Sequence, residues 1–239
     1  MKTKLQRWIH LNMAMIGGFL GGFAILNHHD LFGSAQTSNL ITIAMDAVGH
    51  PDKDLLIRVI GLLIYGGAIA LTVILPKYTK LPMKYLSICI DALAVFMIGL
   101  FPEDLNDFIA LYPLFFAMAI QWCSFSGADG YTCSSIFSTN NFRQFVSSMT
   151  DYCCSKNKES LRKGKFFGKV LFFFHVGVAA SYLSCSHFGI SGAWVCFLPI
   201  ISAGSLVWAE SNRVVLKHTL GHLYVSYRRM GMMSELQQQ

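Results

Sequence analysis

The 239-residue sequence contains little charge: Asp, Glu, Lys and Arg make up 13% of it, while hydrophobic residues make up 54%. Soluble domains carry roughly 25% charged residues. The 19 basic and 13 acidic side chains are too few to cover a water-soluble globule with so much apolar surface. The composition therefore excludes a soluble enzyme, a disordered chain and a nucleic-acid-binding domain. It predicts an α-helical protein with several membrane spans.

The sequence also lacks the patterns that accompany disulfide, metal and catalytic chemistry. Its 7 cysteines are odd in number and form no C-x-x-C pair, so we interpret them as small apolar packing residues. No H-E-x-x-H motif or cluster of carboxylates occurs, and His218 and His222 have no third metal ligand nearby in the sequence. We therefore expect a protein that is not an enzyme and that binds neither a metal nor a cofactor.

Six segments are long and apolar enough to cross about 30 Å of hydrocarbon, which takes about 20 helical residues. They are Ile9–Leu26, Leu55–Leu75, Met83–Phe101, Phe108–Gly127, Phe166–Cys185 and Ile190–Trp208. Two further segments, 37–48 and 139–154, are too short or too polar for a simple crossing. The chain therefore has either eight crossings, or six crossings and two short segments that enter the membrane and return on the same side.

The charges of the loops favour six crossings, because Lys and Arg concentrate on the cytoplasmic side of a membrane. Six crossings place the N-terminus, the lysines of 77–84, the basic stretch 156–169 and the tail in the cytoplasm, and leave only Lys53 and Arg58 outside. We expect a multi-pass protein of the cell (inner) membrane with cytoplasmic N- and C-termini. The basic cytoplasmic loops then account for the net charge of +6, because they orient the inserted chain and contact anionic lipid. The charge therefore does not indicate a nucleic-acid partner.

An internal repeat divides the chain into two halves. Thr37 and Thr139 are 102 residues apart, as are Asn39 and Asn141. The same order of elements occurs twice: a long span, a polar stretch, a short helix and two long spans. Because each half has three crossings, the halves would be inverted relative to one another, as in many transporters. The predicted fold is an all-α integral membrane protein with six membrane-spanning helices and two short re-entrant or broken helices.

The predicted boundaries follow from this division. Residues 1–101 form the first half, with spans 1–3 and the re-entrant segment 37–48. Residues 102–209 form the second half, with spans 4–6 and the re-entrant segment 139–154. Residues 210–239 form a cytoplasmic tail whose apolar residues recur at helical spacing beside basic ones, which is typical of an amphipathic helix on a membrane surface.

Three short motifs carry a resemblance to a known family: Gln36-Thr37-Ser38-Asn39, Ala119-Ile120-Gln121-Trp122 and Ser138-Thr139-Asn140-Asn141. They resemble motifs of the YoaK family of uncharacterised bacterial multi-pass membrane proteins, and the resemblance covers residues 10–210. Ser38 and Asn140 replace the glycines of the family's motifs, and Trp122 replaces an asparagine. The chain is thus similar to a divergent member. The resemblance implies a membrane location and, by conjecture, transport, without an established substrate.

The two repeated motifs predict two helix starts, because Thr, Ser and Asn cap helix N-termini. The ten-residue linkers Asn27–Gln36 and Asp129–Ser138 extend to about 33 Å, enough to reach the membrane midplane. Two helix N-termini, each with about half a positive charge, would then face one another. We predict a hydrated site for a small polar or anionic solute, with the contacts Gln36, Thr37, Asn39, Gln121, Thr139 and Asn141. Alternatively, the same residues cap ordinary helices at the membrane interface.

Ionisable residues within apolar runs are costly and point to function by default. Asp91 and Asp46 lie in such runs, Arg143 follows the second cap, and His175 lies in an aromatic segment. These four residues are candidates for coupling or gating. Structural alternatives are open for each: Asp46 and Arg143 can reach water by snorkelling, and His175 can be a packing residue with a hydrogen bond.

The sequence therefore predicts a transporter of a small polar or anionic solute. A channel for a small solute or ion uses the same features, and a non-catalytic scaffold or sensor is the further alternative. An integral-membrane enzyme is disfavoured because acid, base or metal residues do not converge in any motif. The expected partners are the lipid bilayer and a small-molecule or ion substrate, and homo-oligomer formation is left open.

Overall fold

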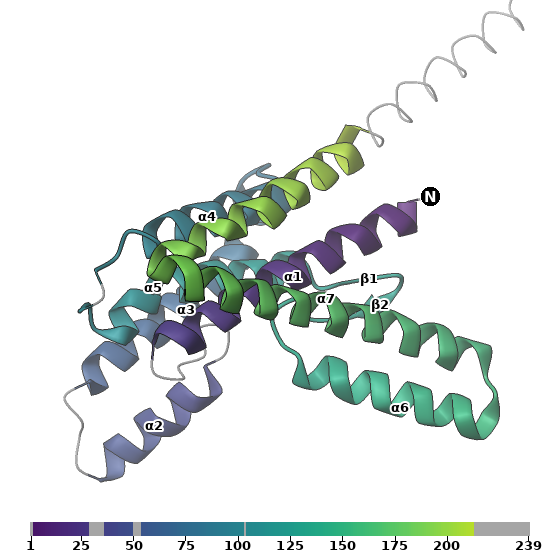
Figure 1. The fold of residues 1–239 in the computed structure, drawn as a ribbon, viewed down its shortest axis with the longest axis horizontal. Helices are drawn as coiled ribbons and strands as arrows, with labels where there is room; N and C mark the ends of the chain where they lie inside the picture. Colours follow the sequence, from purple (N-terminus) through teal and green to yellow (C-terminus); the bar gives the residue numbers. More distant parts are fainter. Residues whose placement is uncertain (1, 29–35, 50–53, 103, 213–239) are drawn as a thin grey trace, which may run out of the picture.

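The computed structural model describes residues 2–28, 36–49, 54–102 and 104–212. The described residues form a bundle of helices, from which two helices diverge on one side (Figure 1). Beyond residue 212, the amphipathic tail expected at 210–239, with His218 and His222, lies outside the described residues. Most of the linker expected at 27–36 also lies outside them.

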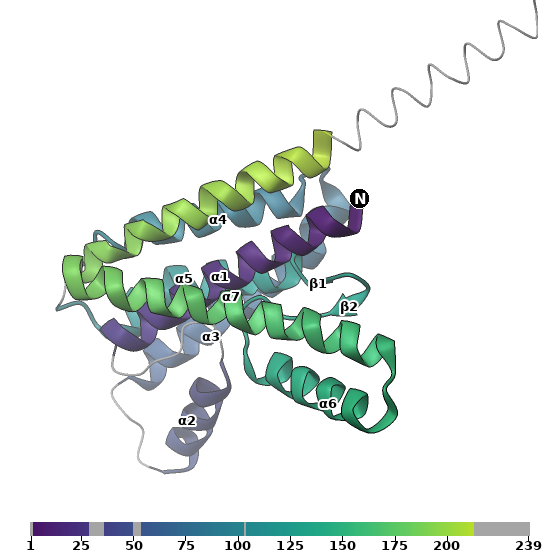
Figure 2. The same ribbon diagram turned by 45° about the vertical axis from the view of Figure 1, so that its right-hand side comes forward.

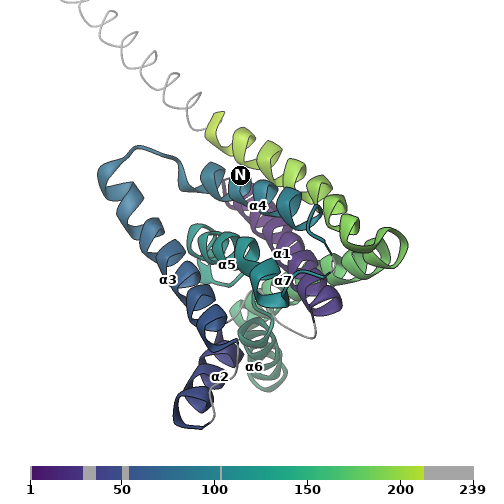
Figure 3. The same ribbon diagram turned by 90° about the vertical axis from the view of Figure 1, so that its left-hand side faces the viewer.

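Up to residue 188, the described part of the chain forms the helices α1 (Lys2–Asn27), α2 (Thr37–Val48), α3 (Leu55–Tyr78), α4 (Met83–Ile98), α5 (Asp107–Ser124), α6 (Thr139–Ser155) and α7 (Lys158–Phe188). The 3-10 segment η1 (Gly189–Cys196) follows α7, and residues 197–212 are again α-helical. Figure 3 shows that η1 reverses the chain, so that residues 197–212 run back from the end of α7. They lie alongside α4, where Lys84 pairs with Glu210 at 2.7 Å (Figure 2).

Within the described residues, four helical stretches are long and apolar enough to cross a membrane: Lys4–Asn27, Leu55–Tyr78, Asp107–Ser124 and Lys158–Asn212. Their surroundings differ. In its most apolar window α1 is 83% buried within the protein, whereas α3 is only 17% buried. An apolar helix that exposes most of its surface needs a lipid environment. The chain is therefore a mostly helical protein of the membrane, with α1 inside the bundle and α3 at its surface.

Helices α1 and α7 pack closely against each other at the centre of the bundle. A Cβ atom added at Gly18 would lie 2.0 Å from the carbonyl oxygen of Phe174, and one added at Gly177 would lie 2.0 Å from that of Met15. Only glycine fits at such separations, which is how small residues permit close packing of membrane helices. The glycines of α1 and α7 thus bring the two backbones into contact.

A short β-hairpin between α5 and α6 departs from the predicted all-α fold. Strands β1 (Gly127–Ala128) and β2 (Tyr131–Thr132) pair antiparallel, with Gly127 opposite Thr132. Asp129 and Gly130 form the two-residue turn with φ of 57° and 85°. Tight hairpins need positive φ at both turn residues, and Asp-Gly is a preferred pair for this turn. The expected extended linker Asp129–Ser138 was therefore wrong over its first residues, which fold back before the chain enters α6.

Candidate functional site

The starts of α2 and α6 meet at a cavity of about 760 Å³. Its lining comes from both helix starts, from the middle of α3 and from the end of α5: Gln36, Thr37, Leu40, Tyr65, Trp122, Phe137, Ser138, Thr139, Asn140 and Arg143. Both repeated sequence motifs therefore contribute to a single cavity. In Figure 1, α2 and α6 diverge from the middle of the bundle toward opposite ends.

Both helices begin at the predicted residues, Thr37 and Thr139, but the predicted side-chain caps are absent. The residues at the cap positions are Gln36 and Ser138, and neither forms a side-chain cap hydrogen bond. Without such caps, amide N–H groups in the first turn are available for a ligand. The prediction of two helix starts was confirmed, whereas the capping chemistry assigned to Thr, Ser and Asn was wrong.

Each repeated motif divides into an exposed threonine and a buried asparagine. Thr37 and Thr139 line the cavity with exposed side chains. Asn39 and Asn141, two residues further on, are 6% and 2% exposed and do not belong to the lining. The structure therefore brings the two threonines to the cavity as expected, and it places both asparagines behind the cavity wall, which differs from the predicted position.

The two buried asparagines stabilise their helix starts through backbone carbonyls. Nδ2 of Asn39 donates to the carbonyl of Arg58 at 3.2 Å and to Oε1 of Gln36 at 2.8 Å. Nδ2 of Asn141 donates to the carbonyls of Ser134 at 2.7 Å and Phe137 at 2.9 Å. Buried amides must find such partners. These side chains therefore position the motif rather than contact the space inside the cavity.

The side-chain amide of Gln36, which lines the cavity, has a hydrogen-bond donor without an acceptor in the described part of the chain. The side chain is 7% exposed, and Oε1 accepts from Asn39, but Nε2 has no hydrogen-bond partner among the described residues. A buried polar group without a partner costs about 1–3 kcal/mol. Water or a bound solute in the cavity would satisfy this amide.

The remaining lining residues set the charge and shape of the cavity. Arg143, one helical turn after Thr139, is the one charged residue in the lining that the structure describes, and it donates to Oδ1 of Asn140 at 3.1 Å. Trp122 and Phe137 form an aromatic wall, with their rings edge to face at a centroid distance of 5.0 Å. The cavity therefore combines positive potential, hydroxyl and amide groups, and an apolar wall.

Gln121, predicted as a solute contact, is fully buried and lies away from the cavity lining. Its Nε2 donates to the carbonyl of Met13 and to Oγ of Ser135, both at 3.0 Å. It therefore joins α5 to α1 and to the segment that leads into α6. The structure thus places Gln121 at a helix junction and not at the predicted solute contact.

Three of the four candidate coupling residues also lie away from this cavity. Asp91 is fully buried in α4, and neither carboxylate oxygen has a hydrogen-bond partner within the described residues. Asp46 lies near the end of α2 and is half-buried. His175 is exposed on α7, with Nδ1 2.7 Å from the carbonyl of Leu171. Only Arg143 of the four lines the cavity.

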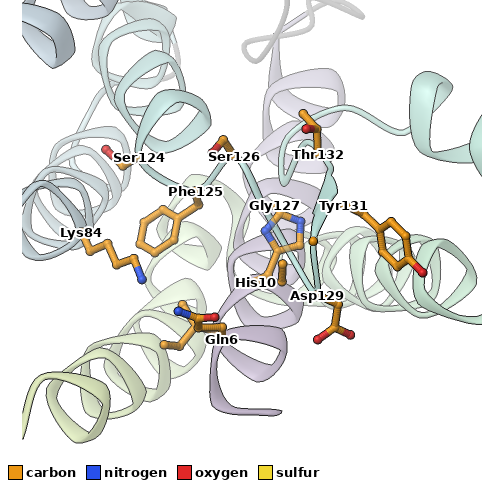
Figure 4. Close-up of a pocket in the computed structure, with 13 residues that line it drawn as sticks. Gln6, His10, Lys84, Ser124, Phe125, Ser126, Gly127, Asp129, Tyr131 and Thr132 are labelled. Carbon is orange, nitrogen blue, oxygen red and sulfur yellow. The ribbon is translucent and has the colours of Figure 1, made fainter. Parts of the chain in front are cut away.

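A second cavity, of about 370 Å³, lies between the β-hairpin, the N-terminal parts of α1 and α4 and the end of α5 (Figure 4). His10 is 1% exposed, and neither ring nitrogen has a hydrogen-bond partner in the described part of the chain. Figure 4 shows His10 next to the hairpin residues Gly127 and Asp129. Sequence reasoning missed this cavity, although a histidine within an apolar span and the Asp-Gly turn were available signals.

Tyr131 closes the hairpin side of this second cavity. Burial and the hydrogen bond that its hydroxyl donates to Glu159 raise the pKa of Tyr131 above its usual value of 10. Asp129, at the turn, forms an ion pair with Arg7 of α1. The hairpin is thus attached to both α1 and α7. No three His, Cys, Asp or Glu side chains converge as a metal site requires within the described ranges.

The long apolar helices define a multi-helix membrane protein. The chain belongs to the family described as "Protein of unknown function (DUF1275)", whose model matches residues 9–206. No curated protein and no solved structure matches the chain.

Proposed function

We propose that the protein is a membrane transporter for a small polar or anionic solute, which binds between the starts of α2 and α6. The observation that carries this proposal is the cavity of about 760 Å³ at which the two helix starts meet. Each helix N-terminus offers amide N–H groups and about half an elementary positive charge. Arg143 adds a full charge, and Gln36, Thr37 and Thr139 add hydrogen-bonding groups.

The pairing of helix ends supports a topology of six crossings. Arg7–Asp129 and Lys84–Glu210 join segments at the end of the bundle where α1 begins. His28 contacts Asp107 at 3.0 Å at the opposite end, where α1 finishes and α5 begins. With α1, α3, α4, α5, α7 and residues 197–212 as the crossings, α2 and α6 each return to the side from which their chain entered.

The packing of the helices supports two inverted halves. The contact between α1 and α7 corresponds to the contact between α5 and α3, because the 102-residue offset relates α1 to α5 and α3 to α7. The pairs α2–α3 and α6–α7 correspond in the same way. Inverted repeats with helices broken near the midplane are a frequent transporter architecture. Tyr65, near the middle of the 24-residue α3, lies at the cavity and agrees with a site at mid-depth.

The basic residues support an orientation. Lys77, Lys80 and Lys84 lie at the same end of the bundle as Arg7. Lys and Arg concentrate on the cytoplasmic side. We place both termini in the cytoplasm and the chain in the cell (inner) membrane, as a divergent YoaK-like member of its family. We propose no catalytic role, since the cavity combines binding groups without a nucleophile and base pair.

A flux assay with a matched pair of variants tests this function. The purified full-length chain is reconstituted in proteoliposomes, and uptake of radiolabelled carboxylates, inorganic anions and small amides is measured. Thr139→Trp places an indole in the cavity, whereas Thr150→Trp makes the same change at an exposed position three turns further along α6. We expect T139W to abolish the flux of the transported solute and T150W to leave it within twofold.

The dependence of the flux on solute concentration distinguishes a carrier from a channel. Flux through a carrier saturates, whereas flux through a channel rises nearly linearly. A panel without any flux above empty liposomes would contradict the proposed function. Equal flux through the T139W and T150W variants would contradict the proposed site.

A further inference from the structure

One face of α7 carries a row of basic residues beside the start of α1. Lys158, Arg162, Lys165 and Lys169 follow one another at spacings of four, three and four residues, which places them on the same helical face. Together with Arg7 of α1 they line a cavity of about 260 Å³. Leu161 and Phe166 form its apolar part, and Asp129 of the hairpin also lines it. We call this cavity the basic pocket.

Most of the positive charge in the basic pocket has no counter-ion. Arg7 is paired with Asp129, and Nη1 of Arg162 lies 3.9 Å from Glu159. Lys158, Lys165 and Lys169 form no ion pair with any acidic residue that the structure describes. Three unpaired ammonium groups on one helix face repel one another and raise the local positive potential. An anion bound among them would relieve that repulsion.

The basic pocket lies next to aromatic residues of the kind that mark a membrane interface. Trp8 follows Arg7 directly, is 53% exposed, and contacts the ring of Phe173 at a centroid distance of 6.0 Å. Phe173 lies one helical turn beyond Lys169, and its neighbour Phe172 is exposed. Exposed Trp and aromatic residues concentrate at the level of lipid headgroups. The basic pocket therefore lies where α1 and α7 pass from apolar surface to charged surface.

We propose that the basic pocket binds the phosphate headgroup of an anionic phospholipid. The ammonium groups of Lys158, Lys165 and Lys169 face the phosphate, and Leu161 and Phe166 contact the apolar part of the lipid next to it. Basic pockets between membrane helices bind acidic headgroups in this way. A lipid bound here joins α1 to α7 on the side of the hairpin. The inference concerns a separate site from the cavity between α2 and α6, and it does not depend on transport.

Native mass spectrometry of the purified full-length chain in mild detergent tests the proposal, because it measures how much lipid stays bound. Phosphatidylglycerol and phosphatidylcholine of the same acyl chains are titrated against three forms of the protein: the unmodified chain, Lys165→Gln/Lys169→Gln and Lys77→Gln/Lys80→Gln. The last variant removes two positive charges at exposed positions outside the basic pocket, one in the last turn of α3 and one just beyond its end.

We expect phosphatidylglycerol to bind more tightly than phosphatidylcholine, with the difference lost only in the K165Q/K169Q variant. Each lysine near an anionic headgroup contributes about a fivefold change in affinity, so that the double variant should lose about 25-fold. The K77Q/K80Q variant should stay within about threefold. Lys165→Arg/Lys169→Arg should restore the preference, and the single Lys169→Gln variant should lose about fivefold if the double variant fails to fold.

Three results would overturn the proposal. Equal losses in the K165Q/K169Q and K77Q/K80Q variants would show only general attraction to acidic lipid. No preference for phosphatidylglycerol in the unmodified chain would remove the lipid site. Full competition by millimolar inorganic phosphate would show a site for a soluble anion instead of a lipid.

Discussion

Thr37 and Thr139, 102 residues apart in the chain, line the same cavity from the first residues of two different helices. Their exposed hydroxyl groups lie where the amide ends of α2 and α6 approach one another. Asn39 and Asn141 are buried behind them and hydrogen-bond to backbone carbonyls. The repeated motif therefore has two functions in each half: a threonine presented to the cavity and an asparagine that stabilises the helix start.

The charge of Arg143 should set the affinity for an anionic solute. We expect Arg143→Gln to raise the KM for uptake about tenfold with little change in the maximal rate, because a charge-assisted hydrogen bond contributes about 1.5–3 kcal/mol. The control is Lys156→Gln, which removes one positive charge just after the other end of α6. Uptake kinetics in proteoliposomes check this prediction. A KM for R143Q equal to that of K156Q would exclude Arg143 from the site.

The buried amide of Asn141 should contribute to stability rather than to solute contact. Asn141→Leu removes two hydrogen bonds to backbone carbonyls, and we expect a loss of about 1–3 kcal/mol, seen as a lower melting temperature in detergent. Asn140→Leu, at the exposed neighbouring position, should change stability by less than about 0.5 kcal/mol. An unchanged melting temperature for N141L would contradict the structural role assigned to this asparagine.

The contact between α1 and α7 should tolerate no side chain at Gly18. Its added Cβ would lie 2.0 Å from the Phe174 carbonyl, so we expect Gly18→Ala to destabilise the protein by about 1–3 kcal/mol. Gly66 of α3 has no atom within 4 Å of an added Cβ. Gly66→Ala should be neutral or stabilise the helix by about 0.5–1 kcal/mol. Melting curves of both variants in the same detergent test the packing; equal curves would argue against this close approach.

The carboxyl group of Asp91 is one of the candidates for coupling that the sequence singles out, and uptake assays can test it. It is fully buried in α4, without a hydrogen-bond partner among the described residues. We expect Asp91→Asn to abolish uptake driven by a pH gradient and to leave solute exchange across the membrane within about threefold, because exchange needs no net proton movement. Ser87→Ala, at a buried position one turn away on α4, is the control and should retain driven uptake. Undiminished driven uptake in D91N would exclude the coupling role.

The sequence alone was sufficient for several features of this protein. Low charge and long apolar runs predicted a helical membrane protein, because such surface cannot face water. The repeated polar motifs predicted helix starts at Thr37 and Thr139. These features depend on local composition and spacing, so that they can be recognised without knowledge of distant contacts.

Only the tertiary structure decided which motif residues face the cavity. Asn39 and Asn141 differ from Thr37 and Thr139 by half a helical turn, and the neighbouring carbonyls of Arg58 and Ser134 determine that the asparagines turn inward. The junction formed by Gln121 and the approach of the α7 lysines to Arg7 likewise depend on chain segments that meet only after folding. Local sequence determines which groups a helix carries, whereas the packing partners decide which of those groups are satisfied and which stay available to a ligand.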